Sequence, residues 1–224
     1  MLDLSLFSAY YLPLSLSRTQ VRLVIGFNSS ATYSVLPKIL RVFREHCPDV
    51  ELDLQELTTH QQCDRLHQNQ IDVGILYLPI ESRILSTTTV LQESLVVAIA
   101  ETHALAALPE LSLKALSHEP FIIPPHHLGG GLYNQILRFF QQTNFTPNVV
   151  QEATQLQTTI SLVAGGVGVA LVPASLQNLQ RPGVVYKMLQ EPTPEIEIAV
   201  AWRQHDSSPV LQKFVNTAAH ITTE

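Results

Sequence analysis

Uncharged polar residues gather at four places where a strand pattern gives way to a helix pattern. These loops are rich in hydroxyl, amide and glycine residues and contain no lysine or arginine: Asn28–Thr32, Thr58–Thr59, Gly129–Gly131 and Thr154–Gln155. Between the carboxyl end of a strand and the start of a helix, unpaired N–H groups and the positive end of the helix dipole converge. The loops therefore predict a site for a small carboxylate or a similar polar ligand, with simple capping of its own helix as the alternative for any one loop.

Two histidines supply the cationic groups that lie nearest to these loops in the sequence. His126 and His127 stand just before the triple glycine. If either side chain reaches the ligand, affinity for an anion should fall as the pH rises through about 6 to 7, where histidine loses its charge. No metal site is expected, because neither these histidines nor His60 and His67 form an HExxH pattern, and paired CxxC motifs do not occur.

The sequence offers no recognisable catalytic group. It has no Gly-x-Ser-x-Gly elbow, and its clustered acidic residues fall at a helix end or on an exposed strand face: Glu45, Asp49, Glu51 and Asp53. The triple glycine lacks the Gly-Lys-Ser/Thr ending of a phosphate-binding loop, and Gly165–Gly168 follows a helix instead of a strand. We expect this second glycine run to stop a helix and to allow close backbone packing, and we expect neither an enzyme nor a cofactor site.

A net charge of -6 over 224 residues makes the chain a poor nucleic-acid binder by itself. Only 14% of the residues are charged, so no strongly positive surface is available for a phosphate backbone. The apolar fraction of 46% is enough for one large core or two small ones. Cys47 and Cys63 are too few for a disulfide framework and suit a reducing cytoplasm; we expect two ordinary thiols, since a redox pair would need Cα atoms within about 7 Å.

Residues 1–19 form an atypical segment. Its apolar run, residues 1–16, carries Asp3 where a secretory signal has lysine or arginine, and Pro13 and several serines interrupt it. The run is also shorter than the roughly 20 residues of a membrane span. We therefore expect a cytoplasmic chain with no membrane association, and an amphipathic anchor is the alternative for this segment.

Short apolar runs alternate with longer stretches of helical period, the pattern of a largely parallel sheet covered by helices. Strands are predicted over residues 21–27, 50–57, 71–77, 121–124, 148–152, 167–172, 184–189 and 195–203, and a β-rich stretch over 87–100. Helices are predicted over 34–46 and 59–68, and around 132–139, 156–163 and 210–218. Pro37 suits the first turn of its helix, and Ser34 is the expected cap.

The order of these segments is repeated within the chain. Residues 121–172 follow the plan of residues 21–76, so that Val73-Gly74-Ile75 corresponds to Val167-Gly168-Val169 and the helix pattern at 39–43 corresponds to that at 136–140. Several matches in the same order are harder to attribute to chance than any single one. We therefore expect two similar α/β lobes with a ligand cleft between them.

Five runs together resemble the effector-binding domain of LysR-type transcriptional regulators. They are Val21–Phe27, Leu36–Phe43, Cys47–Val50, Ile71–Ile75 and Val163–Pro173, and the resemblance extends from about Arg18 to Thr217. It implies the type 2 periplasmic-binding-protein fold, an α/β fold of two Rossmann-like lobes joined by two crossing strands. The first lobe would comprise residues 20–94 and 197–224, and the second lobe residues 95–196.

The resemblance also implies a binding site and partners. In this family a small metabolite, often a carboxylate or an aromatic acid, binds between the lobes, and the domains form dimers within tetramers that bend promoter DNA. With the two histidines included, the expected ligand-binding residues are Ser29, Ser30, Thr32, Thr58, Thr59, Pro125, His126, His127, Leu128 and Thr154. Residues 1–17 resemble neither the winged helix-turn-helix nor its linker helix, so DNA binding is expected only through a domain that is absent from this chain.

These features predict an effector-sensing domain in which a bound metabolite changes the geometry of a homodimer or tetramer and so controls transcription. Two alternatives stay open. One is a transport-type solute-binding protein, and the other is a DNA-binding-deficient partner that regulates a full-length regulator by mixed dimerisation.

Overall fold

Five strands build the sheet of the first lobe, in the order β2-β1-β3-β11-β4. The structure is a computed structural model that describes residues 21–125 and 131–221. The strands are β1 (Arg22–Phe27), β2 (Glu51–Glu56), β3 (Val73–Tyr77), β4 (Leu85–Glu93) and β11 (Ile196–Arg203). β1 pairs in parallel with β2 and β3, whereas β11 pairs antiparallel with β3 and β4. The wholly apolar β3 is buried along its length, as expected of a strand with helices on both faces.

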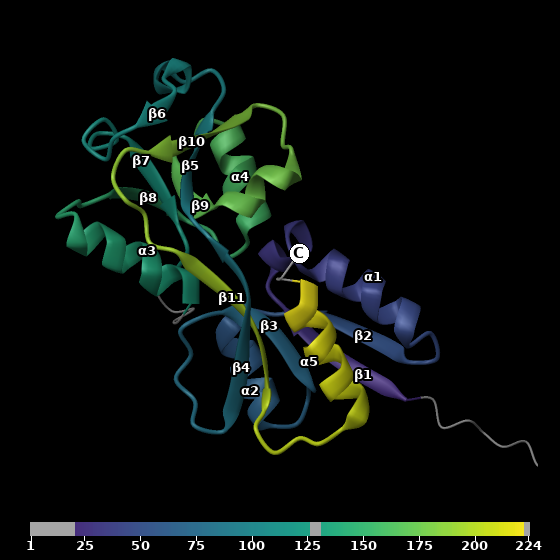
Figure 1. Ribbon diagram of the computed structural model, residues 1–224. Helices are drawn as coiled ribbons and strands as arrows, with labels where there is room; N and C mark the ends of the chain where they lie inside the picture. Colours follow the sequence, from purple (N-terminus) through teal and green to yellow (C-terminus); the bar gives the residue numbers. More distant parts are fainter. Residues whose placement is uncertain (1–20, 126–130, 222–224) are drawn as a thin grey trace, which may run out of the picture.

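Helices cover both faces of this sheet: α1 (Leu36–His46) and α5 (Pro209–Ile221) lie on one, and α2 (Thr59–His67) on the other (Figure 1). Successive side chains of a strand point to opposite faces, so Ile75 joins the core under α1 and α5 while Leu76 joins the smaller core under α2. The rings of Phe43 and Phe214 meet edge to face between α1 and α5, with their centroids 5.2 Å apart. On the other face, Leu66 of α2 packs on Ile71 and Leu76, so α2 lies against β3.

The second lobe contains a four-stranded sheet, in the order β6-β10-β5-β9, and a separate pair, β7-β8. Its strands are β5 (Leu95–Ala100), β6 (Glu110–Leu111), β7 (Pro120–Ile123), β8 (Asn148–Glu152), β9 (Ala170–Pro173) and β10 (Val184–Leu189). Its α-helices are α3 (Gly131–Gln142) and α4 (Leu156–Ala164). The described residues also contain the 3-10 turns η1 (Ser29–Tyr33) in the first lobe and η2 (Ala104–Ala107) and η4 (Ala174–Leu179) in the second.

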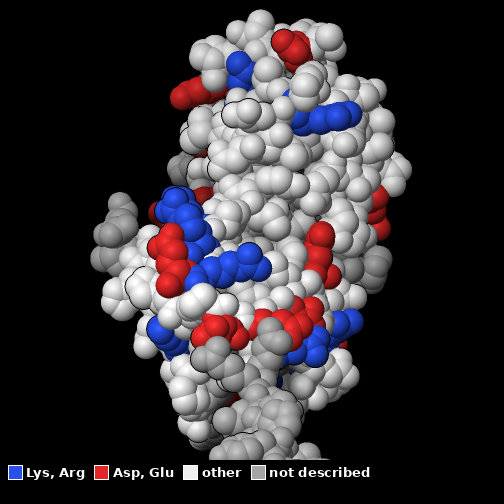
Figure 2. Space-filling model, turned by 90° about the vertical axis from the view of Figure 1, so that its right-hand side faces the viewer, with Lys and Arg blue, Asp and Glu red and all other residues white. Residues whose placement is uncertain are grey.

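Charged side chains do not dominate the surface that faces the viewer in Figure 2. Lysine and arginine are interspersed there with aspartate and glutamate, and wide uncharged areas separate them. Within residues 21–125 and 131–221, no helix combines the length and apolar character that a membrane span needs. In the same part of the chain, no group of three or more histidine, cysteine, aspartate or glutamate side chains could hold a metal ion. Cys47 and Cys63 are both free thiols.

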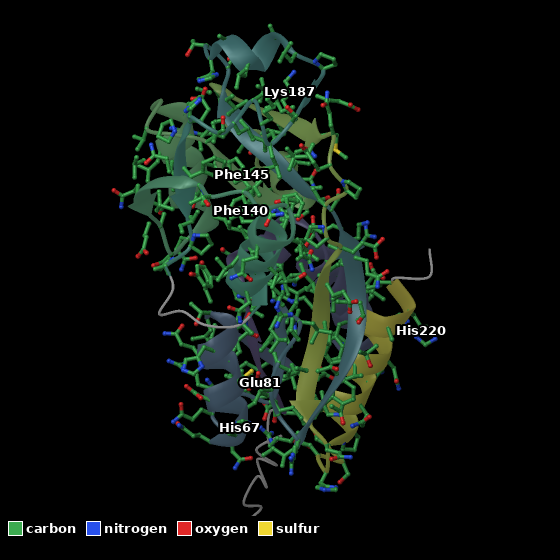
Figure 3. The ribbon with its side chains drawn as sticks, turned by 90° about the vertical axis from the view of Figure 1, so that its left-hand side faces the viewer. His67, Glu81, Phe140, Phe145, Lys187 and His220 are labelled. Atoms are coloured by element: carbon green, nitrogen blue, oxygen red, sulfur yellow. The ribbon has the colours of Figure 1, made fainter. Side chains whose placement is uncertain are left out.

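An aromatic cluster forms part of the core of the second lobe. The ring centroids of Phe121, Phe140 and Phe145 are 5.3 to 5.7 Å apart. Figure 3 shows Phe140 and Phe145 in the interior of that lobe, while Lys187 lies towards its far end. This cluster packs β7 against α3. The second lobe therefore has an apolar centre of its own, as the apolar content of the sequence predicts.

The strand pairing contains the repeat that the sequence predicts. In the first lobe β1 lies in parallel between β2 and β3. In the second lobe β7 pairs in parallel with β8, and Phe121 forms a parallel bridge to Val169 beside β9. Each half therefore runs strand, helix, strand, helix, strand, with its first strand in the middle.

Two chain crossings join the lobes, as the fold prediction required. β4 continues through Ser94 into β5, and the chain returns between Leu189 and Ile196 from β10 to β11. β4 and β11 pair antiparallel from Leu85 to Glu93, so the crossings lie side by side. The prediction of two α/β lobes joined by two crossing strands is confirmed, and the residue limits of the lobes stay a prediction.

Local predictions were confirmed at the second glycine run and were wrong at one helix cap. Gly165 is the C-cap of α4, and a Cβ atom at Gly168 would lie 2.5 Å from the carbonyl oxygen of Pro120, so a helix stop and a close backbone approach are both present. Ser34 does not cap α1. Val35 occupies the N-cap position, because Ser34 closes η1 and its hydroxyl donates to the carbonyl oxygen of Ser30 at 3.2 Å.

Candidate functional site

A cleft with a cavity volume of about 80 Å³ lies between the lobes. The first lobe supplies η1, the end of β3 and the start of α2, and the second lobe supplies the residue after β7 and the starts of α3 and α4. The lining residues are Asn28, Ser29, Ser30, Leu57, Thr58, Thr59, Tyr77, Pro124, Leu132, Tyr133, Thr154, Gln155 and Leu156. All of these described residues are uncharged, so their polar contacts with a ligand would come from N–H, hydroxyl and amide groups.

The cleft brings together residues from three of the four predicted loops. Five residues predicted to bind ligand line it: Ser29, Ser30, Thr58, Thr59 and Thr154. Thr32 instead turns back on η1, where its hydroxyl donates to the carbonyl oxygen of Ser29 at 2.5 Å. Pro125 is buried next to Pro124, which lines the cleft. His126, His127 and Leu128 lie outside the described residues, so their roles and the histidine-dependent pH effect stay predictions.

Capping explains one of the polar helix starts but not two others. Thr58 forms a capping box with Gln61: its hydroxyl accepts from the Gln61 N–H at 3.3 Å, and its own N–H donates to Gln61 Oε1 at 3.0 Å. Asn28 and Gln155 occupy the N-cap positions of η1 and α4 without any side-chain cap hydrogen bond. The first N–H groups of η1 and α4, which precede the intrahelical bonds from Ala31 to Asn28 and from Thr159 to Gln155, therefore have no side-chain cap.

A hydrogen-bond network lies behind the first-lobe wall. Oδ1 of Asn28 accepts from Nε2 of Gln62 at 3.2 Å and from the hydroxyl of Thr59 at 3.4 Å. The Thr59 oxygen in turn accepts from the backbone N–H of Tyr77 at 3.3 Å. These contacts tie the loop after β1 to the start of α2 and to the end of β3.

Tyr77 extends the network to η1. Its side chain is buried, and its hydroxyl donates to Oγ of Ser30 at 2.5 Å. Burial raises the pKa of the Tyr77 hydroxyl well above its ordinary value, although the hydrogen bond to Ser30 acts in the opposite direction. The Tyr77 hydroxyl therefore keeps its proton at neutral pH and can donate it to Ser30.

The second-lobe wall is more exposed and more apolar. Thr154 and Gln155 are exposed to solvent, whereas Leu132 and Leu156 are buried side chains that reach the cleft from α3 and α4. Pro124 and Leu132 give an organic ligand an apolar surface opposite the hydroxyl and amide groups of the first lobe. The cleft can therefore bind a small molecule that is polar at one end and apolar at the other.

Side chains also bridge the lobes outside the cleft. Asn178 on η4 donates to the carbonyl oxygen of Tyr33 at 2.7 Å, and Gln135 on α3 donates to that of Leu78 at 2.6 Å. Beside the crossing strands, Glu93 accepts from the N–H of Ser175 at 2.5 Å and from its hydroxyl at 3.0 Å. Burial raises the pKa of Glu93, and the hydrogen bonds from Ser175 act against that rise.

Sequence reasoning missed the residues that hold the cleft from behind. Gln62 and Tyr77 were not singled out, and Asn28 was considered only as part of its loop. A signal for Gln62 was present, because it falls at helical spacing between Thr59 and Leu66, and all three are buried on one face of α2. A glutamine on the buried face of a helix must find internal hydrogen-bond partners.

Comparisons with known proteins assign the family. The family model described as "LysR substrate binding domain" matches residues 17–221, and the chain belongs to this family. Among curated proteins it is similar to the HTH-type transcriptional regulator AlsR of Bacillus subtilis (strain 168), with 34% identity over 194 residues, which are 87% of this chain and 64% of AlsR. The chain thus spans less than two thirds of the length of that relative. Its curated relatives are transcriptional regulators, in agreement with the prediction that the chain is not an enzyme.

Solved structures show the same fold. The effector-binding domain of BenM, with its effector benzoate, is 26% identical, has a TM-score of 0.80, and matches 91% of this chain and 93% of that one. The effector-binding domain of QuiR in complex with shikimate has a TM-score of 0.84 at 18% identity and matches 92% of this chain and 98% of that one. The recognition made from the sequence and the fold class are both confirmed.

Proposed function

We propose that this chain is the effector-sensing part of a LysR-type transcriptional regulator and that a small organic acid, a carboxylate or an aromatic acid, binds between its lobes. The observation that carries the proposal is the interlobe cleft, whose first-lobe wall offers hydroxyl and amide groups and whose second-lobe wall adds apolar side chains. The effector-binding domains of BenM and QuiR, which hold benzoate and shikimate, are similar in fold. Both of those ligands carry a carboxylate on a six-membered carbon ring.

The proposed contact residues come from both lobes. Ser29, Ser30 and Thr59 would meet the polar end of the ligand, and Thr154 would approach from the second lobe. Thr58 has its hydroxyl in a capping box and would contribute mainly by position. Thr32, Pro125, His126, His127 and Leu128 stay predicted members of the site.

A ligand that contacts both walls favours the lobe arrangement in which both can be reached. In a complete regulator this shift would change the geometry of a homodimer or tetramer and so move DNA-binding domains. Control of DNA belongs to the whole protein, because this chain spans 64% of AlsR. We place the regulator in the cytoplasm, where its DNA and metabolites would be.

A thermal-shift screen of small organic acids tests the proposal. A ligand present at a hundred times its dissociation constant should stabilise the fold by about 2.7 kcal/mol. The double variant Ser30→Ala/Thr154→Ala, which removes one hydroxyl from each wall, should weaken that shift, and the exposed Thr87→Ala is the matched control. Failure of every acid to bind, or equal binding by the double variant, would count against this site.

A further inference from the structure

Gln62 is wholly buried behind the cleft and joins the ends of three strands. Its Nε2 lies 3.1 Å from the carbonyl oxygen of Leu57, just after β2, and 3.2 Å from that of Ile75, in β3. The same nitrogen lies 3.2 Å from Oδ1 of Asn28, just after β1. One side-chain amide on α2 therefore contacts all three loops or strands that lead to the first-lobe wall.

Two backbone carbonyls decide which way the Gln62 amide is turned. A carbonyl oxygen can only accept a hydrogen bond, so the nitrogen of Gln62 must face Leu57 and Ile75. Its Oε1 has no hydrogen-bond partner among the described residues and points at Gly74, where a Cβ atom would lie only 2.7 Å away. The orientation therefore does not depend on any ligand.

Two glycines make room for this side chain. Gly26 on β1 and Gly74 on β3 are register partners in the parallel pair. A Cβ atom at Gly26 would lie 3.1 Å from Cγ of Gln62, and one at Gly74 would meet its Oε1. The absence of both Cβ atoms leaves the space under α2 that Gln62 fills together with the end of Ile71.

The fixed Gln62 amide in turn fixes Asn28. The two N–H groups of Gln62 are shared among three acceptors, so one of them is bifurcated, and the Asn28 atom that faces them must be the acceptor Oδ1. Thr59 supports the same direction: its oxygen accepts from the N–H of Tyr77, and its own proton goes to Oδ1 of Asn28. With Oδ1 engaged twice, Asn28 does not cap η1, and its Nδ2 has no partner among the described residues.

The Ser30 hydroxyl is also left to act as a hydrogen-bond donor. It accepts the proton of the buried Tyr77 hydroxyl, so its own proton is available for another acceptor. Asn28 and Ser30 both line the cleft. An asparagine and a serine, which elsewhere can donate or accept, are both biased here towards donation.

We propose that Gln62 is a positioning residue that sets the hydrogen-bond polarity of the cleft, so that Asn28 and Ser30 present N–H and O–H donors to the ligand. The inference rests on the proposed function and specifies it: the ligand places an acceptor-only group, such as a carboxylate, against the first-lobe wall. The described lining residues include no lysine or arginine, so the discrimination arises from oriented neutral donors. A primary amide of the same shape would set its own N–H groups against these donors and bind more weakly.

Matched ligand pairs test this polarity directly. Benzoate, salicylate and shikimate are each compared with the corresponding primary amide by calorimetry on the full chain, at up to millimolar concentrations. The quantity measured is the ratio of the two dissociation constants, and wild type should favour at least one carboxylate by about tenfold or more. A protein that merely became less stable would lose affinity for both members of a pair and keep the ratio.

Three variants change the polarity by different routes. Gln62→Leu keeps the volume but removes the N–H groups, so the Asn28 amide can turn, and the ratio should fall towards one. Asn28→Asp keeps the shape and replaces the free Nδ2 by oxygen, so carboxylate affinity should fall by about a hundredfold and amide affinity by much less. Gly74→Ala displaces the Gln62 amide without changing its chemistry and should also lower the ratio. The control is Gln68→Leu, an exposed residue at the end of α2, which should keep the wild-type ratio.

Each outcome decides a different claim. Equal ratios in wild type and a folded Gln62→Leu would overturn the role of Gln62 and leave the sensor function standing. Amides that bind wild type as tightly as carboxylates would overturn the donor polarity. If no acid and no amide binds, this inference and the proposed function fall together. If Gln62→Leu does not fold, Asn28→Asp and Gly74→Ala decide the question, and unchanged ratios in both would overturn the proposal.

Discussion

The two walls of the cleft use the same strand and helix order in different ways. In the first lobe, Gly74 leaves space that the buried amide of Gln62 fills, and the amide holds Asn28. In the second lobe, the corresponding Gly168 lets the backbone of Pro120 approach, and the polar residues at the cleft, Thr154 and Gln155, are exposed. One wall therefore has its hydrogen-bond directions set in advance, while the other combines an apolar core with solvated polar groups. The comparison indicates that the first wall determines what the ligand must offer and that the second adjusts to it.

The largest effect should come from the glycine of the second lobe. Gly168→Ala places a Cβ atom 2.5 Å from a backbone oxygen that cannot rotate away, and we expect a loss of about 3 kcal/mol in unfolding free energy. Gly74→Ala meets the end of a side chain instead and should cost about 1 kcal/mol. Urea denaturation measures both, with Gly165→Ala as the control because its nearest contact would be an ordinary 3.4 Å. Equal losses at Gly74 and Gly168 would contradict the distinction between the walls.

Removing a hydroxyl group should lower the unfolding free energy more on the first wall than on the second. Ser30→Ala leaves the buried Tyr77 hydroxyl without its acceptor, so we expect a loss of about 2 kcal/mol. Tyr77→Phe should cost about 1 kcal/mol, and the double variant should cost less than the sum of the two. Thr154→Ala on the exposed wall should stay within about 0.5 kcal/mol of wild type. A large loss for Thr154→Ala, or strict additivity at Ser30 and Tyr77, would show that the first wall is not preorganised as described.

Much of this architecture could be predicted because it depends on local patterns. The spacing of apolar residues predicted most strands and helices to within a few residues of their observed ends, and the repeated order of segments indicated two lobes. The predicted ends of the elements were wrong where tertiary contacts decide them. β9 begins at Ala170 and not at residue 167, because the chain first turns at Gly165 and Gly166, the latter with a φ of 72°. The short β6 and the cap of α1 were missed or misassigned for the same reason.

The candidate site was predictable only in part. Polar residues at helix starts drew attention to Ser29, Ser30 and Thr59, since a strand end followed by a helix start is visible in the sequence. Gln62 was missed, because its partners are two backbone carbonyls and one amide that come together only through the pairing of β1 with β2 and β3. Every residue has a backbone carbonyl, so the sequence does not reveal which carbonyls will accept a side-chain hydrogen bond. A buried position in a helical pattern was the one signal available.

The pH dependence of stability tests the contact beside the crossing strands. Burial raises the pKa of Glu93 above the ordinary value of 4.5, so the folded state binds this proton more tightly than the unfolded chain does. Its contribution to stability is therefore present at low pH and is lost as the pH rises from 4.5 through the raised pKa. Glu93→Gln carries no titrating group, so the difference in unfolding free energy between wild type and variant should fall across that range. A difference that increased with pH would reverse the assignment.

Effects of about 1 kcal/mol or less should come from the two side chains that bridge the lobes away from the crossing strands. Gln135→Ala removes a partly buried hydrogen bond to Leu78, and we expect a loss of about 1 kcal/mol. Asn178→Ala removes an exposed bond to Tyr33, where water can substitute, and should cost about 0.5 kcal/mol. Gln135 lies on α3, which forms part of the second wall, so its loss should also broaden the range of lobe angles seen in solution scattering of the unliganded protein. A saturating ligand that contacts both walls should restore the narrow range in Gln135→Ala. If neither substitution changes the scattering, the crossing strands alone set the lobe arrangement. The second wall would then adjust to the ligand by movement of its loops and not of the whole lobe.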